Sequence, residues 1–189
     1  RGERLNPFTK VLPKPLVPVY EKTIIDFIID QFKPYDINNF TFTLNYKANL
    51  IKTYLKNNIK KNKYYFHNEK NPLGTIGSLS LLNEKKISKN FFVTNCDILI
   101  KSDFKKIYDF HMKKNNDVTI VTCYQKYKIP YGTCIAKKDG TLKSLVEKPE
   151  TYHLINTGFY VMNKKILKHI PKNTHLDFNE FVQNLLKKK

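Results

Sequence analysis

The sequence predicts an α/β fold, in which a mostly parallel central sheet is flanked by helices and a β-hairpin is inserted in the second half. Segments with strand periodicity alternate with amphipathic helical segments, and this order is typical of parallel sheets covered by helices. The 189 residues, of which 41% are hydrophobic, are enough to bury one sizeable core. We therefore expect a single domain over residues 1–189.

The spacing of apolar residues gives the elements in chain order. Phe91–Val93 is apolar throughout, which is typical of a central strand buried on both faces. Turn residues Asp139 and Gly140 predict a hairpin that pairs Thr133–Ala136 with Leu142–Glu147. The predicted helices are 23–32, 48–55, 78–82, 104–112, 164–170 and 179–186, and the other predicted strands are 40–44, 64–67, 118–124 and 158–162.

The chain is strongly basic, because 34 Lys and Arg residues against 16 Asp and Glu residues give a formal charge of +18. A solvated lysine surface that attracts phosphate ligands and a nucleic-acid-binding surface are both compatible with this charge. The three cysteines, Cys96, Cys123 and Cys134, are widely spaced, so we expect reduced, buried thiols. No apolar run approaches the ~18 residues of a membrane span. Together these features favour a cytoplasmic protein without a membrane partner.

The opening segment, Arg1–Val19, contains four prolines and several basic side chains, so it is expected to be a stiff loop. Gly2 lets backbone N–H groups approach phosphate oxygens, and Arg4 can donate to two such oxygens at once. Prolines on both sides of Lys14 hold its ammonium group on a rigid backbone. This pattern suits a triphosphate, and a proline-rich surface loop is the alternative.

The order Arg4-Leu5 and then Pro13-Lys14-Pro15-Leu16-Val17-Pro18-Val19 resembles the signature of the sugar-1-phosphate nucleotidyltransferase family. The resemblance implies a Rossmann-like fold of the nucleotide-diphospho-sugar transferase type. Family members carry a strand and two more glycines before this loop, and a second metal-binding Asp in a downstream Trp-x-Asp-x-Gly segment. We therefore expect the chain to be truncated at both ends. Asp177 is interpreted as the cap of the last helix rather than as a substitute for that Asp.

Two further segments match the nucleotide side of the family. Leu73–Leu79 resembles the segment whose backbone lies against the nucleotide base, which implies nucleotide-binding roles for Gly74, Thr75 and Gly77. Glu69 precedes it and would accept hydrogen bonds from guanine. A turn at the start of a helix and a solvated loop glutamate are the alternatives.

The end of the predicted central strand resembles the family's metal-binding strand. In Val93-Thr94-Asn95-Cys96-Asp97, the resemblance implies that Asp97 binds Mg²⁺ beside the phosphates, since a hard cation prefers carboxylate oxygen. An Asp that caps the turn after a strand is the alternative. The resemblance gives Arg4, Lys14 and Asp97 the catalytic roles.

Three segments resemble the family's sugar-phosphate pocket. They contain Gly132, the pair Glu147 and Lys148, and then Asn156 and Gly158. Glu147 would accept hydrogen bonds from sugar hydroxyls, and Lys148 would hold the sugar's phosphate. Adjacent side chains on an extended segment point to opposite sides, so both can serve only if the backbone twists before Pro149. A surface ion pair between Glu147 and Lys148 is the alternative.

The resemblance therefore implies transfer of a nucleotidyl group from an NTP to a sugar 1-phosphate, with release of pyrophosphate. Residues 1–124 form the expected nucleotide-binding half and residues 125–189 the sugar-phosphate half. The branch closest in appearance contains hexose- and amino-sugar-1-phosphate guanylyltransferases, so GTP is the expected nucleotide. No nucleic-acid partner is expected, and homo-oligomerisation is left open. The alternatives are an inactive or regulatory nucleotide-sugar-binding module and a basic RNA-binding protein.

Overall fold

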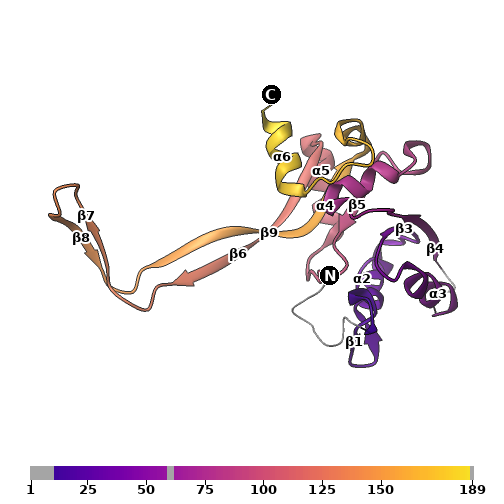
Figure 1. Cartoon of the computed structure of the whole chain (residues 1–189), viewed down its shortest axis with the longest axis horizontal. Coiled ribbons are helices and arrows are strands. Elements are labelled where there is room, and N and C mark those ends of the chain that lie inside the picture. Colours follow the sequence, from indigo (N-terminus) through magenta and orange to yellow (C-terminus); the bar gives the residue numbers. More distant parts are fainter. Residues whose placement is uncertain (1–10, 59–61, 188–189) are drawn as a thin grey trace. The chain divides into compact units, whose positions relative to one another are not determined.

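The computed structural model describes residues 11–58 and 62–187. The chain divides into two compact units, one of residues 1–119 with 158–189 and one of residues 120–157 (Figure 1). The predicted boundary between a nucleotide half and a sugar half, at residue 124, divides the chain by function and stays a prediction.

The first unit contains most of the regular structure. Its helices are α2 (Ile24–Asp30), α3 (Ala48–Asn58), α4 (Gly74–Gly77), α5 (Phe104–Lys114) and α6 (Phe178–Leu186), and its strands are β1 (Pro18–Val19), β2 (Lys22–Thr23), β3 (Asn39–Leu44), β4 (Lys63–Asn68) and β5 (Asn90–Thr94). Short 3-10 helices span Lys14–Leu16, Lys33–Tyr35, Ser78–Leu81, Glu84–Lys86 and Lys164–His169. Strands β6 (Val118–Lys128) and β9 (Glu150–Asn163) begin or end in this unit and continue in the other.

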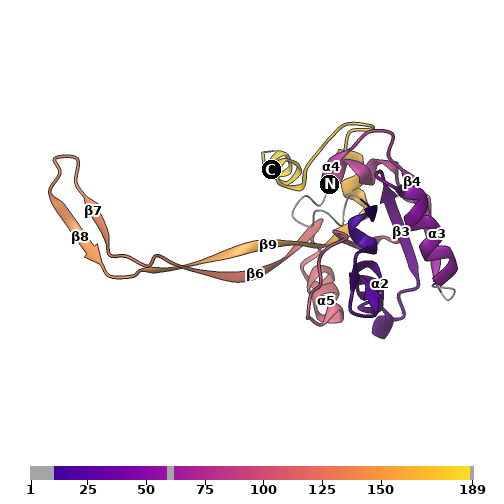
Figure 2. The ribbon, with the colours of Figure 1, turned by 60° about the horizontal axis from the view of Figure 1, so that its bottom comes forward.

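Strands β3 and β4 form the predicted parallel pair and lie side by side in Figure 2. They run in register from Asn39 opposite Lys63 to Leu44 opposite Asn68. Helix α3 connects them, as a parallel pair requires a crossover between its strands. A hydrophobic core lies in this part of the unit and consists of the buried residues Leu16, Ile25, Ile29, Leu44, Ile51 and Leu55. The predicted α/β fold class is confirmed.

A second sheet has the strand order β5-β9-β6, so β9 is the middle strand. Strands β5 and β9 are antiparallel, with Phe91 opposite Met162 and Val93 opposite Tyr160. The strand that is buried on both faces is therefore β9, in residues 158–163, whereas Phe91–Val93 is only half-buried. An apolar run identifies a sheet strand but not its place in the strand order, because neighbours distant in sequence decide that place.

Two predicted helices differ from the observed ones. The helix expected at 78–82 begins earlier, at Gly74, and residues 78–81 form a 3-10 turn. Residues 164–169 also form a 3-10 helix rather than an α-helix. Both segments are short and bury Ile76, Leu79, Ile166 and Leu167 in one cluster, so tertiary packing rather than helix propensity sets their form.

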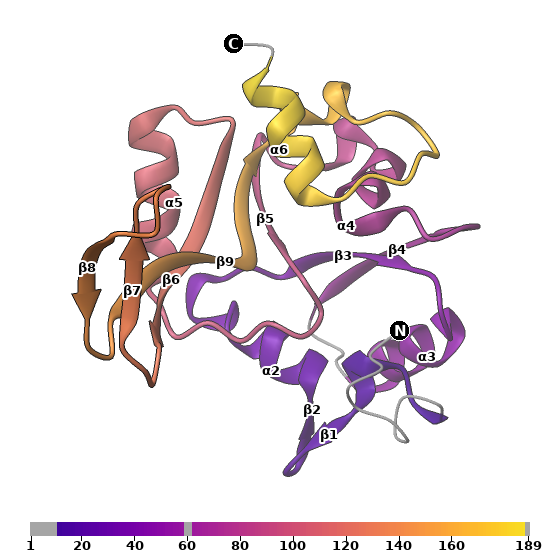
Figure 3. The same ribbon diagram turned by 60° about the vertical axis from the view of Figure 1, so that its left-hand side comes forward.

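The second unit contains the predicted hairpin. Strands β7 (Thr133–Ala136) and β8 (Leu142–Val146) pair antiparallel, with Thr133 opposite Val146 (Figure 3). An ion pair of 2.7 Å between Lys126 Nζ and Glu150 Oε2 joins β6 and β9 within this unit.

All three cysteines are free, as predicted, but they are exposed rather than buried. Cys123 and Cys134 lie on strands β6 and β7 of the second unit, where most side chains are exposed, and Cys96 lies in the loop after β5. In residues 11–58 and 62–187, the structure contains no helix long and apolar enough to cross a membrane.

His111 is a buried polar residue at the end of α5, with 1% of its surface exposed. Its Nδ1 lies 2.8 Å from Thr119 Oγ1, and its Nε2 lies 3.3 Å from Asn90 Oδ1. Because an amide oxygen only accepts, Nε2 carries the proton and Nδ1 accepts from the Thr119 hydroxyl. Burial lowers the pKa of His111 below its ordinary value of 6.5, against a smaller opposing effect of Asp117.

Acidification is expected to destabilise the protein through His111. The pKa of this imidazole is lower in the folded chain than in the unfolded chain, so the unfolded state binds more protons as the pH falls below about 6.5 and the free energy of unfolding decreases. Denaturant unfolding near pH 7.5 and near pH 5.5 measures this loss. His111→Gln removes the titrating group and should reduce the loss, whereas His175→Gln, at an exposed position, should keep it. Equal losses in the two variants would contradict the assignment.

Candidate functional site

Lys14 is presented by a short turn that is fixed by its neighbours. It is the first residue of the 3-10 helix Lys14–Leu16 and is flanked by Pro13 and Pro15. The N–H of Leu16 donates to the carbonyl of Pro13 at 2.8 Å. The side chains of Pro15 and Leu16 are buried, and Leu16 belongs to the cluster beneath β3 and α3. The ammonium group of Lys14 therefore lies on a backbone that the core holds in place.

Asp97 lies just beyond the carboxyl end of β5. The backbone N–H of Asn95 donates to the carbonyl of Gly158 at 3.1 Å, which continues the β5–β9 pairing past the last residue of the strand. After Asp97, the side-chain amide of Gln31 donates to the carbonyl of Ile100 at 2.7 Å and ties the loop to α2. The loop that carries Asp97 is thus held at both ends.

These two residues meet, although 83 positions separate them in the sequence. The ammonium group of Lys14 donates to Oδ2 of Asp97, and each side chain is 32% exposed. Ligands of α/β proteins bind beyond the carboxyl ends of strands, which is where this pair lies. The structure therefore brings together two of the three residues predicted to be catalytic. Arg4 and Gly2 lie outside the described residues.

Cys96 stands between Asn95 and Asp97 and is exposed as a residue. Desolvation of its sulfur, and secondarily the charge of Asp97, raise the pKa of the Cys96 thiol above its ordinary value. A thiol with a raised pKa is a poor nucleophile at neutral pH. The raised pKa therefore argues against a nucleophilic role for Cys96.

Gly158 supports the Asp97 loop from the neighbouring strand. Its φ of +81° is in the region that favours glycine, and a Cβ there would lie 2.6 Å from Nδ2 of Asn95. The glycine was predicted to admit a sugar. The structure gives it a further reason, since any larger residue would displace Asn95.

Gly158→Ala is expected to lower the free energy of unfolding by about 1–3 kcal/mol, because it adds both a strained φ and a clash with Asn95. Gly140→Ala is the matched control, since Gly140 has a φ of +83° and nothing within 4 Å of the added Cβ. Denaturant unfolding of both variants separates the two effects. A loss as large in Gly140→Ala would show that the contact with Asn95 contributes nothing.

The Leu73–Gly77 segment, predicted to contact the nucleotide base, forms α4 and the residue before it. Glu69 joins it, because its Oε2 accepts from the backbone N–H of Leu73 at 3.0 Å. The structure therefore brings Glu69 together with Gly74, Thr75 and Gly77. One carboxylate oxygen of Glu69 already holds this turn, and reading of a guanine edge by Glu69 stays a prediction.

Asp177 does not cap its own helix, contrary to the sequence-based interpretation. It occupies the position before α6, but its side chain makes no capping bond to α6. Instead, Oδ1 of Asp177 accepts from the backbone N–H of Thr75 at 3.1 Å. Nothing in the local sequence indicates this partner, which lies 102 positions away.

The second unit brings together three of the residues predicted for the sugar phosphate. The Nζ of Lys148 lies 3.7 Å from Oε1 of Glu147, and a Cβ on Gly132 would lie 3.0 Å from Oε2 of Glu147. Lys148 has a φ of +47°, so the backbone does twist before Pro149, as the use of both side chains requires. Asn156 lies on the part of β9 that belongs to this unit and is exposed.

A magnesium ion would find one hard ligand at the Lys14–Asp97 contact, the carboxylate of Asp97. The described residues contain no group of three or more His, Cys, Asp and Glu side chains that could enclose a metal. Mg²⁺ commonly uses one or two carboxylates together with substrate phosphates and water, so a single aspartate fits that mode of binding.

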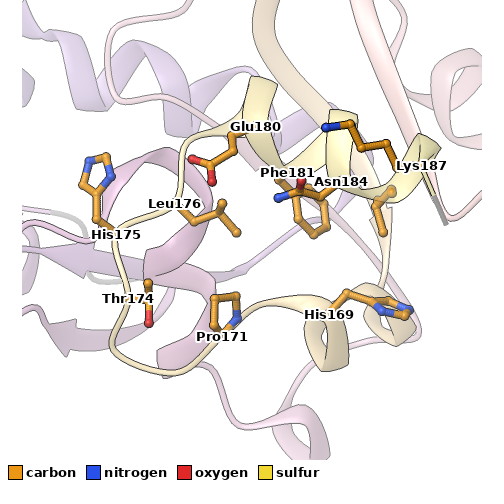
Figure 4. A pocket seen from close by; sticks show the side chains of 10 residues that line it. His169, Pro171, Thr174, His175, Leu176, Glu180, Phe181, Asn184 and Lys187 are labelled. Carbon is orange, nitrogen blue, oxygen red and sulfur yellow. The ribbon is translucent and has the colours of Figure 1, made fainter.

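A separate pocket of ≈ 360 Å³ lies between α6 and the segment before it (Figure 4). Leu176, Phe181 and Pro171 form its apolar part, and charged or polar side chains of His169, His175, Glu180 and Lys187 surround it. None of the sequence-predicted site residues lines this pocket.

The fold and the Lys14–Asp97 contact define an α/β protein with a basic and an acidic side chain gathered beyond a strand end, the place where such proteins bind their ligands. The whole chain, residues 1–189, matches the family described as nucleotidyl transferase. The protein therefore belongs to the nucleotidyl transferase family, as its resemblance in sequence implied.

Individual relatives agree with this assignment. The chain is 33% identical over 183 residues to the mannose-1-phosphate guanylyltransferase catalytic subunit beta of Dictyostelium discoideum, and the match covers 93% of the chain and 51% of the relative. It thus spans about half the length of the curated relatives that it matches. Crystal structures of HddC from Yersinia pseudotuberculosis are 28% identical with a TM-score of 0.66 and, for the complex with GMP-PN, 27% identical with a TM-score of 0.63. The matches cover 88% of this chain and 76% and 74% of those chains.

Proposed function

We propose that the protein transfers a nucleotidyl group from an NTP to a sugar 1-phosphate. The observation that carries this proposal is the contact between Lys14 and Asp97, because the resemblance in sequence gives both residues catalytic roles and the two side chains meet in space. The relatives named as mannose-1-phosphate guanylyltransferases support the choice of substrate class.

The proposed reaction is a single in-line displacement. An oxygen of the sugar 1-phosphate attacks the α-phosphorus, and the bond from that phosphorus to the bridging oxygen breaks. Pyrophosphate leaves with the electron pair. Lys14 would stabilise negative charge on the phosphates, and this positioning and charge stabilisation account for most of the catalysis in phosphoryl-type transfers.

Magnesium is part of the proposal. Asp97 would hold the ion, which when bound supplies positive charge to the phosphates. Lys148 would place the sugar phosphate, and Glu147 would accept from the sugar hydroxyls. The resemblance in sequence also assigns Gly132, Asn156 and Gly158 to sugar binding, and Arg4 would contact the phosphates.

Lys14→Ala tests the central assignment. Loss of its ammonium group is expected to lower the rate of pyrophosphate release by roughly 10²–10³-fold, as loss of other preorganised charge-stabilising groups does. The free energy of unfolding should change by no more than about 1 kcal/mol, because the Lys14–Asp97 pair is one-third exposed. Lys105→Ala is the matched control, since it breaks an exposed pair of 2.6 Å with Asp109 on α5. Wild-type rates in Lys14→Ala would refute the catalytic role.

GTP is the proposed nucleotide, supported by the guanylyltransferase relative and by the HddC complex with GMP-PN. A ligand that binds only the folded state raises the melting temperature, by the equivalent of about 2.7 kcal/mol at 100 times its dissociation constant. With Mg²⁺ present, thermal unfolding in the four NTPs and deoxythymidine triphosphate should show the largest shift with GTP. A larger shift with another nucleotide would replace GTP in the proposal.

An inactive or regulatory module that binds a nucleotide sugar is the second candidate function. Nucleotide binding without pyrophosphate release would favour it. RNA binding through the lysine surface is less well supported. The Lys14–Asp97 contact favours a specific phosphate-binding site, to which the positive charge of the chain would attract a nucleotide. The cytoplasmic location stays a prediction, and a homo-oligomer is a possibility that the sequence leaves open.

A further inference from the structure

Three backbone N–H groups of α4 are bound by the segment that precedes α6. Thr75 N–H donates to Oδ1 of Asp177 at 3.1 Å, and the N–H groups of Ile76 and Gly77 both donate to the carbonyl of Leu176 at 3.0 Å. The first N–H groups of a helix have no acceptor within it, so they need partners from elsewhere. Here the two acceptors that serve these three N–H groups come from about 100 positions further along the chain.

Bonds also run in the opposite direction. The N–H of Leu176 donates to the carbonyl of Leu73 at 2.9 Å, and the N–H of Phe178 donates to Oγ1 of Thr75 at 2.8 Å. Thr75 thus caps α6 while Asp177 caps α4. We refer to residues 73–77 and 176–178, joined by these bonds, as the reciprocal cap. Figures 1 and 3 both show α4 and α6 as neighbours.

The glycines of α4 fit this contact closely. A Cβ on Gly74 would lie 2.7 Å from the carbonyl oxygen of Leu176, and one on Gly77 would lie 2.4 Å from that of Thr174. Gly74 has a φ of +76°, which also favours glycine. Both glycines are therefore required by the protein's own packing, in addition to any contact with a base.

A four-residue helix is too short to be stable alone, so the position of Leu73–Gly77 depends on tertiary contacts, which include the burial of Ile76 and the reciprocal cap. The N–H groups of Thr75, Ile76 and Gly77 already donate to Asp177 and Leu176. A base that lies against this segment would therefore contact atoms other than these three N–H groups. We propose that Asp177 is a positioning residue for the nucleotide, which sets the place of Gly74 without touching the ligand. This inference rests on the proposed function and on the prediction from the sequence that Leu73–Gly77 contacts the base.

The test compares Asp177→Ala, Asp177→Asn and Glu180→Gln with the wild-type protein. Asp177→Ala removes the acceptor for the Thr75 N–H, whereas the amide oxygen of Asp177→Asn can replace it. Glu180→Gln removes the same charge from the same helix, at a residue that lines the pocket of Figure 4 instead. Hydrogen exchange of the Thr75, Ile76 and Gly77 amides reports the order of the segment directly. Steady-state kinetics and titration with GTP, both with Mg²⁺ present, measure whether the segment contributes to nucleotide binding.

In Asp177→Ala, the three amides should exchange their hydrogens faster than in the wild type. The dissociation constant and the KM for GTP should both rise by about tenfold, because this is the effect of losing a good helix cap. The KM for mannose 1-phosphate should stay unchanged, and Asp177→Asn and Glu180→Gln should resemble the wild type. Faster exchange with unchanged GTP affinity would overturn the positioning role. Unchanged exchange would overturn the cap itself. A wild-type protein that binds no nucleotide would overturn the proposed function, and the exchange data would still decide whether Asp177 orders α4.

Discussion

The antiparallel pairing of β5 with β9 is the constraint on which the rest of the first unit depends. Residues 158–163 of β9 are buried on both faces, and alternate side chains serve different clusters. Phe159 packs with Phe32, Phe92 and Phe104 on one side. Tyr160 stacks on Phe178 with ring centroids 3.9 Å apart and belongs to the cluster that contains α4 and α6. A shift of register by one residue would exchange these two sets of contacts.

Lys14 and Asp97, the two residues of the candidate site, derive their positions from this arrangement. Asp97 lies just beyond β5, where the N–H of Asn95 donates to the carbonyl of Gly158 on β9. Lys14 is placed by Leu16, which packs beneath the parallel pair β3 and β4. The contact between Lys14 and Asp97 therefore joins the parallel and the antiparallel parts of the unit. Substitutions in either core that move these strands should affect the site although they touch no ligand.

Local pattern predicted the elements, and contacts distant in sequence determined what it missed. Apolar periodicity identified α2, α3, α5 and α6, and turn residues identified the β7–β8 hairpin. The same reasoning assigned Asp177 to its own helix, because an Asp before a helix does not indicate a partner about 100 positions away. The resemblance assigned the glycines of α4 to the base, with a turn at the start of a helix as the alternative, and neither interpretation indicates their close contact with residues 174–177. One signal was available and unused. Phe104, Ile107, Tyr108 and His111 share a helical face, which marks the buried histidine of α5.

The exposure of the Lys14–Asp97 pair is consistent with a site that must change partners. A fully buried ion pair is costly to separate, because each charge is left without a partner in a medium of low dielectric constant. This pair is one-third exposed, and separating such a pair costs only about 0–1 kcal/mol. A triphosphate that takes over Lys14, and a cation that takes over Asp97, would therefore oppose little existing interaction. Binding of these two ligands would then replace the Lys14–Asp97 contact rather than order two separate side chains.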